Sequence, residues 1–244
     1  MLNKEKFLDV VRESFKTYLC VGTSRSTAKL KSLHGKIAKD LKEILGDDFT
    51  VQAQGFGEDK EECINGRYYP KNVDIGINYR GNPVAAYAVK FVMRNYSQNS
   101  NNYFENMLGE TANLRSNLIP YFQIFIIFDK VPYYKKGGEF SHYEEISANN
   151  VSKYLKLSKD NNEMYFHIPN KTLFVLINLE EKELNYKFCN ESEYAEYYLK
   201  NIDRPNLLKY SNKINWDFGE NVIFNDYEDF IRRTSYTILG KVKN

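Results

Sequence analysis

Val73–Met93 reads VDIGINYRGNPVAAYAVKFVM, and the fold is decided by this stretch. Two apolar runs, Val73–Tyr79 and Val84–Met93, flank the turn-forming string RGNP. Runs rich in β-branched and aromatic residues, joined by glycine and proline, predict an antiparallel β-hairpin. Asp74 lies inside the first run and Lys90 inside the second. Because a charge within a buried strand is costly unless it is paired or bound to a metal, the hairpin is also where chemistry is expected.

The elements around this hairpin follow from apolar periodicity. Before the hairpin, the pattern predicts helices over residues 3–19 and from Ser26 or Thr27 to Leu45, then a strand at Phe49–Gln54. After the hairpin, the pattern predicts a helix over 97–117, a strand at Tyr121–Phe128, a polar loop over 130–145, a helix near Ile146–Leu157 and a strand at Leu173–Leu179. This order predicts an α/β (α+β) fold in which a mixed central β-sheet is flanked by helices.

The chain of 244 residues, 42% of them hydrophobic, suits one domain with a substantial core. Residues 1–190 form the predicted core with its N-terminal helices. Residues 191–244 are predicted as a C-terminal helical extension packed on the same domain. Its helices are expected at Glu193–Lys200 and Tyr227–Leu239, with a helical or loop piece around Trp216.

Composition and charge exclude several classes of protein. The net charge of +2 points to no particular partner. Cys20, Cys63 and Cys189 stand far apart, with no cysteine–histidine cluster, so neither a zinc site nor a disulfide framework is expected. The N-terminal stretch lacks the apolar segment of a signal peptide, and the longest apolar run is too short to span a bilayer. We therefore expect a cytoplasmic protein with no membrane partner.

Two interpretations of Asp74 and Lys90 are open from the residues alone. In the first interpretation the two residues have no catalytic role: they form a buried ion pair, or the alternation of the strands turns both side chains toward solvent. Alternatively, the two charges form the centre of an active site. Because the two opposite charges lie on neighbouring strands, a single explanation should account for both.

The arrangement resembles the PD-(D/E)XK nuclease motif, in which an acid on one strand precedes an acid-x-lysine on the next. Here sixteen positions separate Asp74 from Lys90, and the order of elements over about residues 27–180 is similar to that family's αβββαβ core. The resemblance to type II restriction endonucleases implies a Mg²⁺-dependent enzyme that cuts double-stranded DNA at a specific sequence, and a homodimer. It leaves two alternatives: a repair or recombination nuclease of the same fold, and a degenerate module that binds DNA without cutting it.

One position departs from the family's pattern, because Ala88 stands two residues before Lys90 where an acid is usual. Some restriction enzymes of this family carry that carboxylate on the following helix. Glu105 is the first candidate and Glu110 the second. The string NNYFENMLGE also resembles a segment that follows the catalytic lysine in some of these enzymes, and it places Asn101, Asn102, Glu105 and Gly109 on that pattern. The alternative reading is an ordinary helix start with an asparagine cap.

The resemblance assigns a role to each of these residues. Asp74 is expected to be a bridging Mg²⁺ ligand and Glu105 a second ligand, with the carbonyl of Val89 and the carboxylate of Glu43 as further candidates. Hard oxygen ligands suit this ion, which neutralises phosphate charge and activates water. Lys90 would orient or deprotonate the attacking water, or stabilise the charge of the transition state.

Polar and basic residues outside the core are the candidates for holding DNA. They comprise the segment just beyond the lysine strand, the start of the next helix and a basic loop: Arg94, Asn95, Tyr96, Gln98, Asn101, Asn102, Lys135 and Lys136. Such groups contact phosphates and base edges in DNA complexes. Arg67, Tyr68 and Tyr69, directly before the Asp74 strand, are weaker candidates for a groove contact.

Overall fold

The computed structural model describes residues 3–21, 27–180, 187–213 and 216–243. Its central strand is β6 (Tyr121–Phe128), of which all eight residues are buried. β6 pairs in parallel with β5 (Asn82–Val92) on one side and with β9 (Lys171–Leu179) on the other. The nearly unbroken apolar sequence of β6 is that of a strand covered on both faces of a sheet, as predicted.

The remaining strands of the sheet extend it on both sides of β5, β6 and β9. The order is β1-β4-β5-β6-β9-β10, and β11 also pairs with β9. The added strands are β1 (Phe49–Ala53), β4 (Ile75–Tyr79), β10 (Leu208–Tyr210) and β11 (Val222–Phe224). β1, β4 and β5 are antiparallel, whereas β5, β6 and β9 are parallel, so the predicted mixed sheet and the order helix, three strands, helix, strand are confirmed.

The predicted hairpin is formed by β4 and β5, which are joined by a two-residue turn. Tyr79 pairs with Asn82, so Arg80 and Gly81 make the turn, with φ values of 50° and 82°. Positive φ at both central positions matches the right-handed twist of the two strands. Asp74 is the single residue between β4 and the preceding strand, β3 (Pro70–Val73).

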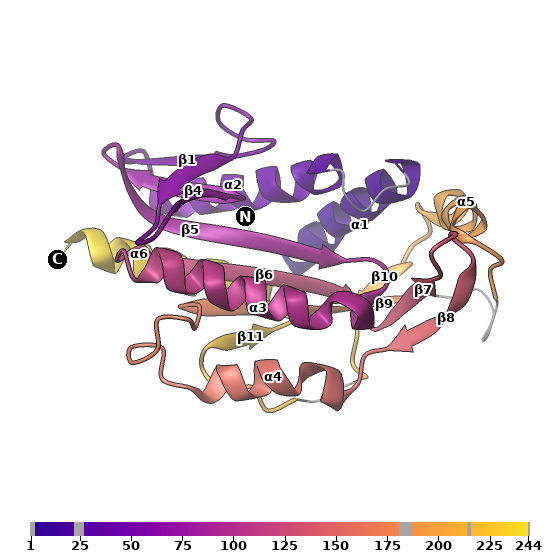
Figure 1. Ribbon diagram of the computed structural model, residues 1–244. Helices are drawn as coiled ribbons and strands as arrows, with labels where there is room; N and C mark the ends of the chain where they lie inside the picture. The colour runs from indigo at the N-terminus through magenta and orange to yellow at the C-terminus, as the bar shows by residue number, and fades with distance from the viewer. Residues whose placement is uncertain (1–2, 22–26, 181–186, 214–215, 244) are drawn as a thin grey trace.

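Helices cover both faces of the sheet (Figure 1). They are α1 (Lys4–Val21), the short η1 (Thr27–Leu30), α2 (Lys31–Leu45), α3 (Tyr96–Arg115), α4 (Ala148–Lys159), α5 (Glu191–Asn201) and α6 (Tyr227–Lys243). Alternate side chains of β6 meet the two helical layers. Phe125 packs against Tyr154 of α4, whereas Phe128 packs against Phe15 of α1. No helix in the described part of the chain is long and apolar enough to cross a membrane.

Two hairpins outside the sheet were not predicted. β2 (Glu62–Asn65) pairs with β3, and β7 (Lys130–Tyr134) pairs with β8 (Phe140–Glu145) inside the segment expected to be a loop. Most residues of β2, β3 and β8 are at least partly exposed, so these strands lack the apolar alternation by which a strand is recognised in sequence.

The β7–β8 hairpin is attached to the start of α3 by two sets of hydrogen bonds. The Glu144 carboxylate accepts the backbone N–H groups of Tyr96 at 2.6 Å and Ser97 at 3.1 Å, which are among the groups that the first turn of a helix leaves unpaired. The Asn95 side chain donates to the carbonyl of Tyr134 at 2.8 Å and accepts from its N–H at 3.0 Å. A carboxylate at a helix N-terminus also favours the helix dipole.

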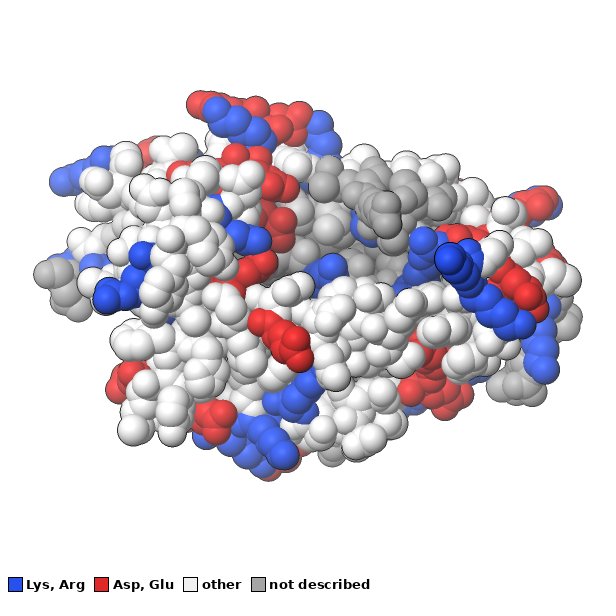
Figure 2. Space-filling model, in the orientation of Figure 1, with Lys and Arg blue, Asp and Glu red and all other residues white. Residues whose placement is uncertain are grey.

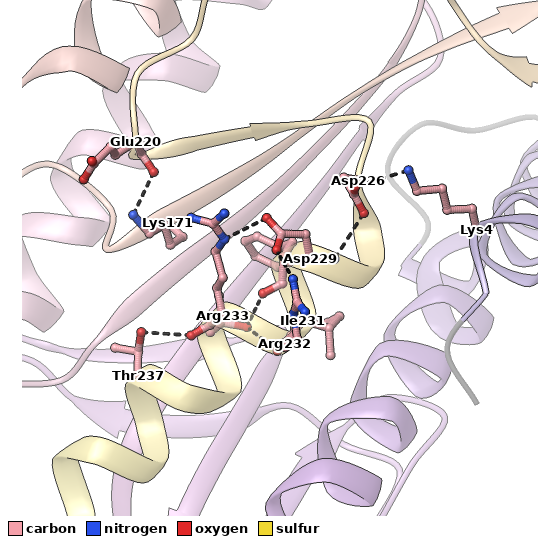
Figure 3. A network of polar contacts seen from close by, with 11 residues as sticks. Lys4, Lys171, Glu220, Asp226, Asp229, Ile231, Arg232, Arg233 and Thr237 are labelled. Carbon is pink, nitrogen blue, oxygen red and sulfur yellow. Dashed lines mark hydrogen bonds and ion pairs between the residues drawn. The ribbon is translucent and has the colours of Figure 1, made fainter.

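The C-terminal segment is part of the sheet, which the prediction of a helical extension did not include. It contributes β10 and β11 in addition to α5 and α6. Figure 3 shows polar contacts that fix the start of α6: Lys4 of α1 pairs with Asp226 at 3.2 Å, and Asp229 pairs with Arg233 at 2.7 Å. In the core, the Tyr227 hydroxyl donates to the buried Asp40 of α2 at 2.7 Å, which joins α6 to α2.

Candidate active site

A pocket of about 300 Å³ lies where the β3–β4 junction, β5, β6 and the middle of α3 meet. Asp74, Lys90 and Glu110 all line it, so both charged residues of the hairpin face the same space. Figure 2 shows this face of the molecule hollowed above α3, with acidic and basic side chains close together along the hollow. The pocket also takes in Lys29, Leu30, Lys71, Asn72, Val73, Ala88, Val89, Phe91, Tyr103, Asn106, Met107, Tyr121 and Gln123.

Asp74 is held in place by the neighbouring strand. Its Oδ2 atom accepts the backbone N–H of Val89 at 2.7 Å. The pKa of Asp74 is raised from 3.8 to about 6, chiefly by burial; within this net shift the Val89 hydrogen bond acts to lower the pKa and the charge of Glu110 acts to raise it. Lys71 and Lys90 act in the opposite direction on the same carboxyl. Asp74 is thus a carboxylate in an environment that resists its charge, as is common at functional sites.

Glu110 is the second carboxylate of the pocket, and both of its oxygens have a partner. Lys71 pairs with Oε1 at 2.6 Å, and the hydroxyl of Tyr121 donates to Oε2 at 2.9 Å. Each carboxylate oxygen can accept more than one hydrogen bond, so these contacts orient Glu110 without saturating it.

Two lysines bring positive charge to the same pocket. The Lys90 ammonium lies 4.4 Å from the centre of the Tyr103 ring, and burial lowers its pKa while Asp74 and Glu110 raise it. Burial, together with the nearby charges of Lys90 and Arg94, lowers the pKa of Lys29 to about 8. Cations and two carboxylates that share a pocket interact more strongly than charges on the open surface.

The expectation that Glu105 faces this pocket is wrong. Tyr103, Met107 and Glu110 lie on the face of α3 that lines the pocket, at helical spacings of four and three residues. Glu105 is five residues before Glu110, which places it about 140° away around the helix. Its side chain is exposed, and its charge raises the pKa of Lys153 on α4. Glu110, the second candidate, occupies the position that was assigned to Glu105.

The structure treats the two further candidate metal ligands, Glu43 and Val89, differently. Glu43 is exposed and does not line the pocket, because it stands thirteen residues along α2 from Leu30, a distance of about 20 Å at 1.5 Å per residue. Its expected place among the metal ligands is therefore wrong. Val89 does line the pocket, and its N–H group is the one that binds Asp74. A role for the Val89 carbonyl stays a prediction.

The residues predicted to hold DNA fall into three groups. Tyr96 is 2% exposed, so the expectation that it contacts DNA is wrong. Asn95 is half-buried and bonded through both ends of its amide to Tyr134; it organises the start of α3, and its contact with DNA stays a prediction. Arg94 is paired with Glu191 of α5. The others are exposed and stay predictions, though Lys135 also pairs with Glu139: Gln98, Asn101, Asn102, Lys135 and Lys136.

The donor set in the pocket fits a hard divalent cation held by few protein ligands. Over residues 3–21, 27–180, 187–213 and 216–243 no group of three or more His, Cys, Asp or Glu side chains is placed to hold a metal. Asp74 and Glu110 are two carboxylates in one pocket, and Mg²⁺ is commonly bound by one or two carboxylates while it keeps several waters. Soft-metal sites need thiolate or imidazole groups, which this pocket lacks.

Sequence reasoning missed Lys29, Lys71, Tyr121 and Gln123 in the pocket. Lys29 lies on η1 and Lys71 on β3, a strand that was not predicted, so the periodicity gave no indication of either. Gln123 did carry a signal: it is the one polar residue in the apolar run YFQIFIIF of β6. A polar side chain within a fully covered strand needs a partner or a function.

The raised pKa of Asp74 leads to a prediction about stability. Asp74→Asn should stabilise the metal-free protein at pH 7.5, because ionised Asp74 is disfavoured by burial. The folded carboxyl binds its proton more tightly than the unfolded one, so stability falls as the pH rises from about 4 to about 6 and the penalty is complete above that range. A shift of about two pKa units corresponds to at most about 3 kcal/mol.

Urea unfolding of both proteins in chelator, at pH 4.5 and pH 7.5, measures the effect. The stabilisation by Asp74→Asn should be larger at pH 7.5 by about 1–2 kcal/mol. A stabilisation of equal size at the two pH values would show that burial does not disfavour the ionised carboxylate.

Comparison of the chain with protein-family models, with curated proteins and with solved structures found no match.

Proposed function

We propose that this protein is a Mg²⁺-dependent endonuclease that hydrolyses phosphodiester bonds of double-stranded DNA at specific sites, in the manner of a type II restriction enzyme. The observation that supports it most directly is the shared pocket of Asp74, Glu110 and Lys90. Two carboxylates that can bind a metal ion and a lysine that can stabilise phosphate charge suit metal-assisted phosphodiester hydrolysis. A simple buried Asp–Lys pair would have no need of a solvent-accessible pocket or of a second acid.

The proposed mechanism assigns one task to each side chain. Asp74 and Glu110 hold the metal ion, which when bound neutralises phosphate charge and lowers the pKa of its water ligand. Lys90 donates hydrogen bonds to the attacking water or to the phosphate oxygens and so stabilises the negative charge that grows in the transition state. Val89 fixes Asp74 through its N–H group, and Tyr121 with Lys71 fixes Glu110, which positions the ligands before substrate arrives.

Exposed groups near the pocket support a nucleic acid as the substrate. The loop that carries Arg67 and Tyr68 is held by Asn113 of α3, whose side chain accepts the Tyr68 N–H at 3.0 Å, and it leads directly into β3 and Asp74. Tyr68 is 75% exposed. Arginine and tyrosine next to a site that handles phosphate suit contact with a DNA backbone or groove. Cleavage of both strands would need two such sites, so a second copy of the chain is part of the proposal.

The metal requirement gives the direct test. DNA of known sequence, incubated with the purified protein, should be cut with Mg²⁺ or Mn²⁺ and bound but not cut with Ca²⁺, because hard carboxylate ligands accept all three ions. Sequencing the product ends reads out site specificity.

The results separate the proposed function from its alternatives. Ends that share one sequence support a restriction-type enzyme, and scattered ends indicate a nuclease of another role. A shift of DNA in gels without cleavage under Mg²⁺ and Mn²⁺ would identify a binding module. Full cleavage in excess chelator would rule out the metal-dependent mechanism.

A further inference from the structure

Gln123 is a buried polar residue in the pocket whose amide oxygen has no hydrogen-bond partner. It is 5% exposed, it lies in the middle of β6, and it lines the pocket together with Asp74 and Glu110. Its Oε1 atom is buried and accepts no hydrogen bond from the residues that the structure describes. Leaving such an oxygen unpaired costs about 1–3 kcal/mol, so packing alone gives no reason for glutamine at this position.

The strand register places Gln123 beside the position where the sequence lacks an acid. Ala88 of β5 is the register partner of Gln123, and side chains of directly paired residues lie on the same face of a sheet. Ile75 pairs with Tyr87, so Asp74 lies level with Ala88 on the other side of β5. Asp74, Ala88 and Gln123 thus form a row across three neighbouring strands. The small Ala88 methyl leaves room in the middle of that row.

We propose that the amide oxygen of Gln123 is the third side-chain oxygen of the metal site and fills the space of the acid that is absent at Ala88. The inference rests on the proposed function, because it needs the metal held by Asp74 and Glu110. An amide oxygen is a hard, neutral ligand of the kind that Mg²⁺, Mn²⁺ and Ca²⁺ accept.

The experiment measures metal affinity without DNA, by calorimetric titration of the full chain with Mn²⁺ and with Ca²⁺. Gln123→Met keeps the length of the unbranched side chain and removes the oxygen, and it should weaken binding of both ions roughly tenfold. Gln123→Glu replaces the amide by a carboxylate of the same shape and should tighten binding relative to the wild type.

Thr172→Val is the matched control. Thr172 is the register partner of Gln123 on β9, it is fully buried, and its hydroxyl likewise accepts and donates nothing among the described residues, but it does not line the pocket. Removing this oxygen should leave metal affinity unchanged. Urea unfolding of each variant confirms that the fold is retained.

Three results decide the matter. Weaker binding by Gln123→Met with unchanged binding by Thr172→Val supports the third ligand. Equal metal affinity of Gln123→Met and the wild type, while Asp74→Asn still abolishes binding, overturns the inference and leaves the proposed function standing. If Asp74→Asn and the wild type bind the ions alike, the pocket is not a metal site, and the inference and the proposed mechanism fail together.

Discussion

Asp74→Asn is expected to lower the rate of Mg²⁺-dependent DNA cleavage by about three orders of magnitude or more, while the protein remains folded. The amide keeps an oxygen for the Val89 N–H but loses the negative charge that attracts the metal. Single-turnover cleavage measures the loss, and circular dichroism with thermal unfolding verifies the fold. The wild type and the variant are compared at equal, saturating Mg²⁺.

Asp40→Asn is the matched control for this prediction. Asp40 is a buried aspartate on α2 outside the pocket, where it accepts the hydroxyl of Tyr227 and pairs with Lys36. This variant should lose stability, because it removes the negative charge that pairs with Lys36 in a buried setting, and should retain cleavage below its melting temperature. Asp74→Asn should show the opposite combination. Near wild-type cleavage by Asp74→Asn would remove Asp74 from the active site.

Glu110→Gln is expected to reduce cleavage by at least two orders of magnitude, because the amide removes one of two anionic metal ligands while Tyr121 can still donate to its oxygen. Glu105→Gln is the control on the same helix and should change the rate less than twofold, since Glu105 faces away from the pocket. Rates are compared over a range of Mg²⁺ concentrations. For Glu110→Gln, a higher Mg²⁺ requirement is expected as well.

The reverse ranking of the two glutamates would mean that α3 presents its other face to the metal in the working enzyme. Equal and small effects of both substitutions would indicate that Asp74 holds the metal without a second carboxylate. Either outcome would contradict the assignment of Glu110.

The sheet was predictable from sequence because its central strands are apolar on both faces or alternate clearly. β5 and β6 together with the β4–β5 turn follow from apolar runs and from one glycine–proline string. Asp74 and Lys90 were identified because they are charged residues that interrupt the apolar runs of this hairpin. The fold and the proposed catalytic pair thus came from a single pattern.

The rest of the site depended on information that a linear pattern does not contain. The choice between Glu105 and Glu110 depends on the rotation of α3 about its axis, and the helix is polar enough around its circumference that its sequence does not fix that rotation. Lys71 enters the pocket from a strand with little apolar character. The position of Gln123 opposite Ala88 depends on strand register, which forms only when the sheet is assembled.

The hydrogen bonds between the β7–β8 hairpin and the start of α3 couple a surface element to the helix that carries Glu110. The tip of the hairpin holds Lys135 and Lys136, and its base holds the N–H groups of Tyr96 and Ser97 through Glu144. These hydrogen bonds fix the start of α3 relative to the hairpin, and Glu110 lies on the same helix. If Lys135 and Lys136 contact a DNA backbone, as we propose, that contact falls on the element that positions the helix of the second carboxylate.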